Sequence, residues 1–482
     1  MASKAVLSPT HRPIPVEIIR EIFSHLSSPL QLLKPHEFPW YLGQICSKWR
    51  AIFLSMQAYF WNEIEMERPE DRETPSQWMY SMNDPEPELP RNRRPDSSRT
   101  IVILAFFLDV ARGAPFSFTL YKEGSYDIDQ EVSCVQLVLP KLIDRSMQWE
   151  NVSMQLRLPE FLLLRGVKNR LPLLQSLELV LPYRDEMEED NHDVTLLPQM
   201  GDIFENAPLL KHIELLCLED AAWKFNWASL TSLHLRYSDS PQTIMTTLQQ
   251  TINLEALDIE STNFDLDPVH VNAKTIKLPY LEYLSIEGEF LLTILETPAL
   301  KELEIAFDAG GSNDARTTVN FLLRSNCELS VLSLENLELW AHKEVLLHTP
   351  DLEDLTLAHD EFLVEVVKWL AGSSTDAAQA RELPLQSLNS LSLCSYSNIN
   401  NRHLQAVQEM IKSRHSTVDT GIKRLQELDI ETDGAWIGSF SVLESLESLC
   451  EEEEIDFEFF SHFGSDPATS ELELSDSDSE QD

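Results

Sequence analysis

The feature that most constrains the fold is one spacing of aliphatic residues, which occurs ten times between residues 174 and 430. Each copy has an aliphatic residue, two variable positions, a second aliphatic residue, one variable position and a third aliphatic residue. The alternation in the last three positions is typical of a β-strand with one buried face. Runs compatible with helices lie between the copies, so the pattern predicts an α/β fold of parallel strands and helices. The copies are Leu174/Leu177/Leu179, Leu210/Ile213/Leu215, Leu230/Leu233/Leu235, Leu254/Leu257/Ile259, Leu281/Leu284/Ile286, Leu300/Leu303/Ile305, Leu329/Leu332/Leu334, Leu352/Leu355/Leu357, Leu388/Leu391/Leu393 and Leu425/Leu428/Ile430.

This pattern resembles the leucine-rich repeat, and the resemblance implies a solenoid whose stacked units share one core. The copies are unevenly spaced, from 19 residues between Leu281 and Leu300 to 37 between Leu388 and Leu425. The asparagine that such repeats carry after the last core position is missing, and Pro182 holds that place in the first copy. We therefore expect an irregular leucine-rich-repeat solenoid over residues 100–450, without an asparagine ladder.

Residues 1–66 have a different apolar pattern, which indicates a small helical domain. Pro15 followed by Glu17 fits a helix start, since proline at the first turn loses no hydrogen bond and an acid there suits the helix dipole. Apolar residues then recur at helical spacing through Leu26, and a second such run extends from Trp40 to Phe53. Helices this short cannot bury so much apolar surface against one another. Because each exposed large side chain forgoes about 1.5–3 kcal/mol of burial, we expect a protein partner.

Three blocks in this region resemble the F-box in order and spacing. They are Ile14-Pro15-x-Glu17-Ile18-Ile19-x-x-Ile22-Phe23-x-x-Leu26, Ile45-Cys46-x-x-Trp49-Arg50-x-Ile52 and Phe60-Trp61. The resemblance, which is to the version found in large fungal families, implies docking onto the Skp-type adaptor of a cullin-based (SCF) ubiquitin ligase. An ordinary three-helix cap with its own core is the alternative. By the resemblance, the adaptor contacts fall on Pro15, Ile18, Ile19, Ile22, Phe23, Leu26, Cys46, Trp49 and Trp61.

Two other segments are predicted to lie outside the packed domains. Residues 67–99 are rich in proline and charge, which predicts a linker, and residues 451–482 form an acidic tail that we expect to be disordered.

Between the linker and the first copy, the sequence predicts a helix at 101–110 and strands at 116–120 and 149–154. A helix between 440 and 449 is expected to close the solenoid.

The charge of the chain disfavours two kinds of partner, and its cysteine content indicates a cellular compartment. The 482 residues include 80 acidic and 37 basic ones, for a net charge of −43, which disfavours binding to nucleic acid or an anionic membrane. The 6 cysteines are scattered singly, which is typical of reduced thiols in the cytoplasm or nucleus. No segment has the length and hydropathy of a membrane span or signal peptide. We expect a soluble protein of the cytoplasm, the nucleus or both.

Acidic residues are enriched at the strand positions that flank the core leucines, which a solenoid would present on its concave side. Two interpretations are open: the acids keep the sheet soluble, or they attract a basic partner. His212 and His234 are expected to be ordinary polar residues of the same surface. The candidate substrate-binding residues are Glu214, Asp258, Glu260, Glu287, Glu304, Glu335, Asp429 and Glu431.

The sequence has none of the patterns that would indicate catalysis. It lacks a glycine-rich phosphate loop, HExxH, GxSxG and any informative cysteine–histidine spacing. We therefore expect a non-catalytic protein with no cofactor and no metal site. The first hypothesis is a substrate-recognition subunit that binds a Skp-type adaptor, and through it a cullin, and presents a protein substrate on the solenoid. The alternative is a repeat protein that binds its partner independently of any ligase.

Overall fold

The structure is a computed structural model. It describes residues 14–32, 35–36, 38–66, 97–120, 134–156, 158–180, 200–216, 223–236, 241–260, 275–307, 315–337, 341–372, 384–416 and 423–463. Most of the predicted linker, at 67–96, and the last part of the predicted tail, at 464–482, lie outside the described residues. The chain divides into two compact units at the bond between Leu230 and Thr231, and each unit is described here by itself.

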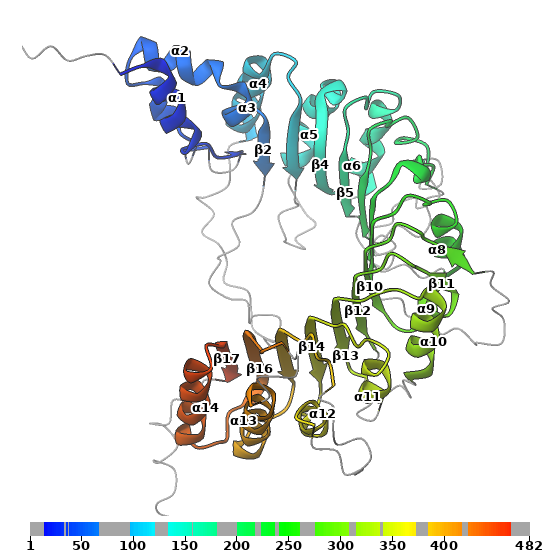
Figure 1. Ribbon diagram of the computed structural model, residues 1–482. Helices are drawn as coiled ribbons and strands as arrows, with labels where there is room; N and C mark the ends of the chain where they lie inside the picture. The colour runs from blue at the N-terminus through cyan, green and yellow to red at the C-terminus, as the bar shows by residue number, and fades with distance from the viewer. Residues whose placement is uncertain are drawn as a thin grey trace, which may run out of the picture. The chain divides into compact units, whose positions relative to one another are not determined.

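The first unit contains six parallel strands in chain order, β1 to β6 (Figure 1). The strands are β1 (Leu30–Gln31), β2 (Glu63–Met66), β3 (Phe116–Leu120), β4 (Trp149–Gln155), β5 (Ser176–Val180) and β6 (His212–Leu216). Its main helices are α1 (Val16–Ser24), η1 (Trp40–Gly43), α2 (Ser47–Ser55), α3 (Gln57–Phe60), α4 (Ser97–Ala111), α5 (Cys134–Asp144) and α6 (Leu158–Phe161). The predicted helix at 101–110 and the strands at 116–120 and 149–154 are confirmed.

The second unit also has a parallel main sheet (Figure 1), and β9 and β11 form a separate small pair. The strands of its main sheet, in order, are β7 (Ser232–Arg236), β8 (Ala256–Glu260), β10 (Tyr283–Glu287), β12 (Glu302–Ala306), β13 (Val331–Glu335), β14 (Asp354–His359), β15 (Ser390–Ser395), β16 (Glu427–Ala435) and β17 (Asp456–Phe463). The pair is β9 (Ile276–Lys277) and β11 (Leu295–Glu296). The helices are α8 (Pro241–Leu248), α9 (Phe290–Ile294), α10 (Ala315–Ser325), α11 (Ala341–Leu346), α12 (Val364–Leu370), α13 (Asn401–His415) and α14 (Phe440–Glu452).

The repeated leucines explain why these segments form strands and how the strands align. In β10, Leu284 and Ile286 are buried, whereas Tyr283 and Ser285 remain partly exposed. Leu284 lies opposite Leu303 of β12, so the core residues of neighbouring strands form continuous rows. All ten predicted copies contribute a strand, from β5 to β16, and in each the second aliphatic residue is buried, although the third, Leu235, is only partly buried in β7. The parallel α/β architecture predicted from the spacing is therefore confirmed.

The N-terminal segment does not form a separate helical domain as predicted for residues 1–66. Its strands β1 and β2 are the first two of the sheet, and β2 pairs directly with β3 of the following region. A cluster of aromatic rings also joins it to α4: Trp61 lies 5.7 Å from Phe107 and 5.8 Å from Phe106 between ring centroids. Two- and four-residue strands give almost no periodic signal, and the aromatic contacts depend on packing that the spacing does not show.

The predicted disordered tail begins too early. The expected closing helix is present as α14, but a further strand, β17, follows it and pairs in parallel with β16. Phe457 lies opposite Leu428 and Phe459 opposite Ile430, so two phenylalanines take the core positions of an eleventh copy. Glu454 stands where the first aliphatic residue would be, and this hides the copy from the strict pattern.

Among the described residues, no helix combines the length and the apolar character needed to cross a lipid bilayer.

Candidate functional site

Helix α1 exposes a row of isoleucines to solvent. Ile14, just before the helix, is 50% exposed, Ile18 is 52% exposed and Ile22 is 46% exposed. Ile18 and Ile22 are four residues apart on α1 and therefore lie one above the other, and Ile14 precedes the helix at the same spacing; these three exposed side chains are called here the isoleucine stripe. Leu26, 41% exposed, follows at the same spacing. Three large aliphatic side chains aligned in water form a patch of the kind found at protein interaction sites.

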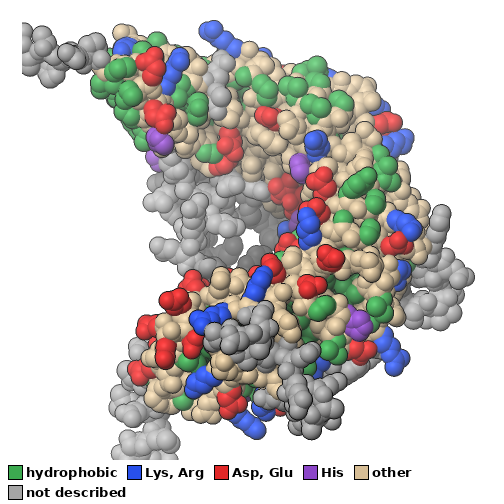
Figure 2. Space-filling view, in the orientation of Figure 1, with side chains coloured by type: hydrophobic (Ala, Val, Ile, Leu, Met, Phe, Trp, Pro, Cys, Tyr) green, Lys and Arg blue, Asp and Glu red, His purple; other side chains and the backbone are tan. Residues whose placement is uncertain are grey.

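The first turn of α2 lies beside α1 and the residues just before it. The Nζ atom of Lys48 donates a hydrogen bond to the carbonyl oxygen of Ile14 over 3.0 Å. The half-exposed ring of Trp49 packs edge-on against Phe23, with ring centroids 5.0 Å apart. Cys46 is exposed, and its Sγ atom accepts a hydrogen bond from the Trp49 backbone at the helix start. Figure 2 shows hydrophobic side chains gathered over the α1 and α2 end of this unit.

Three of the predicted adaptor-contact residues have side chains that are buried within the chain in this structure. Ile19 is 2% exposed, and Phe23 and Trp61 are fully buried. Ile19 and Phe23 lie on a second face of α1, next to the stripe. This second face packs against the rest of the unit. The predicted residues that the structure leaves accessible are Pro15, Ile18, Ile22, Leu26, Cys46 and, in part, Trp49.

The eight candidate substrate-binding acids all occupy strand positions that alternate with the buried leucines. Each is half-buried, and this side of the sheet is called here the open face. Glu214 belongs to β6 in the first unit, and the other seven belong to strands of the second unit. Their position is therefore the one expected from the pattern. The acids do not form a continuous band across the sheet. Between Asp258 and Asp429, the paired positions on β10, β13, β14 and β15 are occupied by serine or threonine.

The carboxylates concentrate on β14, β16 and β17. This acidic group consists of Asp354, Glu427, Asp429, Asp456 and Glu458. Burial raises the pKa of Asp429 above its usual range, and the negative charges of Glu427, Glu458, Asp456 and Asp354 raise it further. Burial, followed by the charge of Glu427, also raises the pKa of Asp354. These acids repel one another, so the surface would favour a positively charged partner.

The acidic group should make the second unit more stable in mild acid. A carboxyl group whose folded pKa is raised binds protons more readily in the folded state, so its contribution to stability is largest below its ordinary range and is lost as pH rises through the raised value. We expect Asp429→Asn to stabilise the chain at neutral pH by less than about 1 kcal/mol after solvent screening. Urea unfolding at about pH 7 and at about pH 4, close to the ordinary pKa of an aspartate, measures both effects. The exposed Glu444→Gln on α14 is the control, and an Asp429→Asn protein less stable than the wild type at neutral pH would contradict the repulsion.

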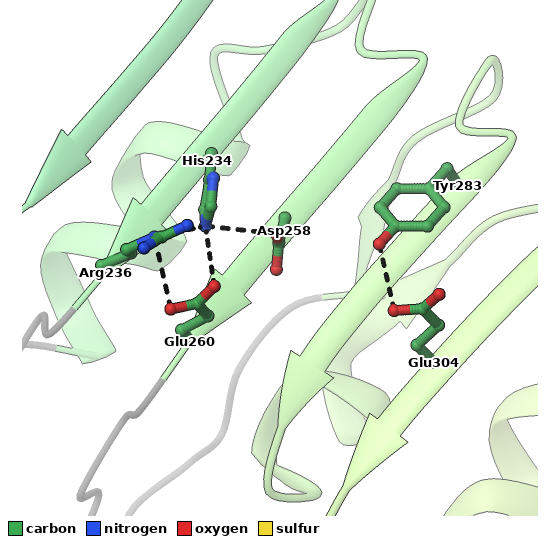
Figure 3. Close-up of polar contacts among 6 residues, drawn as sticks. All are labelled: His234, Arg236, Asp258, Glu260, Tyr283 and Glu304. Carbon is green, nitrogen blue, oxygen red and sulfur yellow. Dashed lines mark hydrogen bonds and ion pairs between the residues drawn. The ribbon is translucent and has the colours of Figure 1, made fainter. Parts of the chain in front are cut away.

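A different arrangement lies at the start of the second unit, where β7 and β8 bring four charged or titratable side chains together (Figure 3). The Nε2 atom of His234 lies 3.1 Å from an Asp258 oxygen and 3.3 Å from a Glu260 oxygen. The Nε atom of Arg236 lies 3.0 Å from the same histidine nitrogen and 3.3 Å from the second Glu260 oxygen. Burial raises the pKa of Asp258, although the charge of His234 opposes the shift.

The neighbouring strands β10 and β12 carry a separate polar pair on the open face (Figure 3). The Tyr283 hydroxyl donates a hydrogen bond to Glu304 over 3.1 Å. Burial, together with the charge of Glu304, raises the pKa of Tyr283 to about 12. The phenol therefore stays protonated at neutral pH and acts as a fixed donor to this carboxylate.

The sequence identified Asp258, Glu260 and Glu304 as members of one acidic surface but gave His234 no specific partner. The structure instead places His234 between the two acids of β8, since His234 is opposite Asp258 in the strand register. One feature of the sequence could have indicated these contacts. His and Arg alternate with aliphatic residues in one copy, and Asp and Glu alternate in the same way in the next copy.

Comparison with protein-family models gives no match, and no curated protein matches the chain.

Proposed function

We propose that this protein is the substrate-recognition subunit of an SCF-type ubiquitin ligase, held by a Skp-type adaptor at α1 and α2. The observation that carries the proposal is the isoleucine stripe, in which Ile18 and Ile22 on one face of α1, and Ile14 just before the helix, are each about half exposed. The F-box resemblance supplies the identity of the partner, since the stripe contains Ile18 and Ile22 of that pattern.

Burial of the stripe would provide much of the binding energy. A large aliphatic side chain gains about 1.5–3 kcal/mol when it moves from water to an apolar interface. Leu26 and the exposed part of Trp49 border the stripe and would extend the contact. The fully buried Phe23 and Trp61 would act indirectly, by fixing the positions of α1 and α2.

The open face is the proposed binding surface for the substrate, and its acidic residues favour a basic protein. In this proposal the chain forms and breaks no bond. It raises the effective concentration of substrate lysines near a conjugating enzyme that the cullin holds. Specificity would depend on the charges and on the apolar and hydroxyl side chains that separate the acids along each strand row.

Co-purification of the full chain with a Skp-type adaptor tests the proposal. We expect Ile18→Ala/Ile22→Ala to weaken binding by about 100-fold, because two half-exposed isoleucines lose most of the apolar surface that they would bury. Ile252→Ala/Ile437→Ala is the matched control, since these isoleucines are 54% and 61% exposed elsewhere. Affinities from calorimetry and circular dichroism spectra of each variant separate a lost contact from a lost fold.

Failure of the wild-type chain to bind the adaptor would refute the ligase assignment. The chain would then be better described as a ligase-independent repeat scaffold. Equal binding by the stripe variant and the control would reject the stripe as the contact surface even if the adaptor binds.

A further inference from the structure

The side chains of His234, Asp258 and Glu260 have the geometry of a cation site. One potential ligand atom from each residue lies within 4.8 Å of both others. The distances from His234 Nε2 to the two carboxylates, 3.1 and 3.3 Å, are close to the edge of a tetrahedron around a zinc ion, about 3.3–3.6 Å for ligand bonds of about 2.0–2.2 Å. The three residues come from two hydrogen-bonded strands, so the backbone fixes their spacing (Figure 3).

The arrangement also has a chemical requirement for a positive charge at this point. The protonated imidazole of His234 would itself supply that charge to the two carboxylates. In the neutral imidazole, Nε2 instead accepts the hydrogen bond from Arg236 and presents its lone pair beside the two carboxylate oxygens. Three electron-rich atoms then converge. The Oδ1 atom of Asp258 is excluded from solvent and makes no hydrogen bond of normal geometry among the described residues, although Ser285 lies near enough to lower the pKa of this carboxyl group. This oxygen is a further acceptor for a cation.

Without a metal ion, Arg236 supplies this positive charge, because its Nε atom contacts both Nε2 of His234 and an oxygen of Glu260. Its side chain is 38% exposed, so the guanidinium can turn outward without leaving a buried space. A metal ion would replace one cation with another at the same acceptors. Arg236 is thus placed to compete with the metal.

We propose that His234, Asp258 and Glu260 bind a divalent transition-metal ion of the zinc class. One imidazole and two carboxylates are ligands that zinc accepts, and three protein ligands leave a fourth position open for water or a partner's side chain. The site would link β7 to β8 and reverse the local charge of the open face. This revises the expectation from sequence that the chain has no metal site, and it is independent of the proposed ligase function.

Calorimetric titration of the chelator-treated full chain with zinc chloride tests the site. We expect saturable binding of one ion per chain, weakened at least 10-fold by His234→Ala and by Glu260→Gln. Arg236→Gln should tighten binding several-fold, because it removes the competing positive charge. His212→Ala, an exposed histidine on β6, is the control and should bind as the wild type does.

Three results would overturn the site: no saturable binding by the wild type, equal binding by His234→Ala and His212→Ala, or weaker binding by Arg236→Gln. Urea midpoints of each variant, measured without metal, distinguish ligand loss from unfolding. Glu260→Gln preserves the shape of the side chain, so the test remains valid if His234→Ala fails to fold. None of these measurements involves the adaptor, and either proposal can fail alone.

Discussion

Replacing Trp61 with alanine is expected to lower the free energy of unfolding of the first unit by about 3–5 kcal/mol, the usual loss for a buried aromatic residue. Trp61 is fully buried and lies within 6 Å, between ring centroids, of Phe38, Phe53 and Phe107. Its Nε1 atom also donates a hydrogen bond to the Phe53 carbonyl over 3.3 Å. The substitution therefore leaves a large cavity and removes one of two donors to the Phe53 carbonyl, which also accepts a hydrogen bond from the Met56 backbone.

Urea unfolding followed by far-ultraviolet circular dichroism measures the Trp61→Ala effect. Trp369→Ala is the control, because Trp369 is half-exposed on α12 of the second unit and should cost much less. Limited proteolysis would show which unit opens first. A loss below about 1 kcal/mol would contradict the central position of Trp61 in the core.

The second large effect is expected from Arg414→Met, which should cost about 2–4 kcal/mol. Arg414 is 2% exposed near the end of α13, and it donates hydrogen bonds to the carbonyls of Pro384 and Leu385 over 3.0 and 2.8 Å. Burial lowers its pKa to about 10, so the guanidinium remains charged at neutral pH. Methionine fills a similar volume but donates to neither carbonyl; that of Pro384 is partly buried, and that of Leu385 keeps only its hydrogen bond from the Leu388 backbone.

The same unfolding experiment measures the Arg414→Met effect, with Arg402→Met as control. Arg402 is exposed in the first turn of the same helix, and its replacement should change stability by no more than about 0.5 kcal/mol. Similar losses for the two variants would show that helix propensity, rather than the buried donor, accounts for the change.

The sequence predicted the sheet well because each repeat carries its own signal. Leu284 and Ile286, for example, are separated by one residue, and that alternation alone determines which side chains enter the core. The second aliphatic residue of each copy then aligns with its neighbours in the stack, as Leu284 does with Leu303. Unequal connections between copies do not disturb this alignment, so uneven spacing did not obscure the fold.

The sequence could not separate the two apolar faces of α1. Ile18 and Ile22 are four residues apart, and so are Ile19 and Phe23, so both pairs form stripes with the same periodicity. Only the packing of the unit decides which pair is buried. The contacts of His234 also depend on tertiary structure. Its acidic partners are more than twenty residues away in the sequence, and the strand register brings them to it.

The pairing of β2 with β3 has a practical consequence for dissecting the chain by truncation. A fragment that begins after residue 66 would lack β1 and β2, and it would leave an unpaired strand edge on β3. It would also expose Phe106 and Phe107 of α4, which pack on Trp61 in the intact chain. Such a fragment should aggregate, and an isolated N-terminal fragment should lose part of its core. Point substitutions on the surface of α1, rather than deletions, are therefore the means to separate adaptor binding from substrate binding.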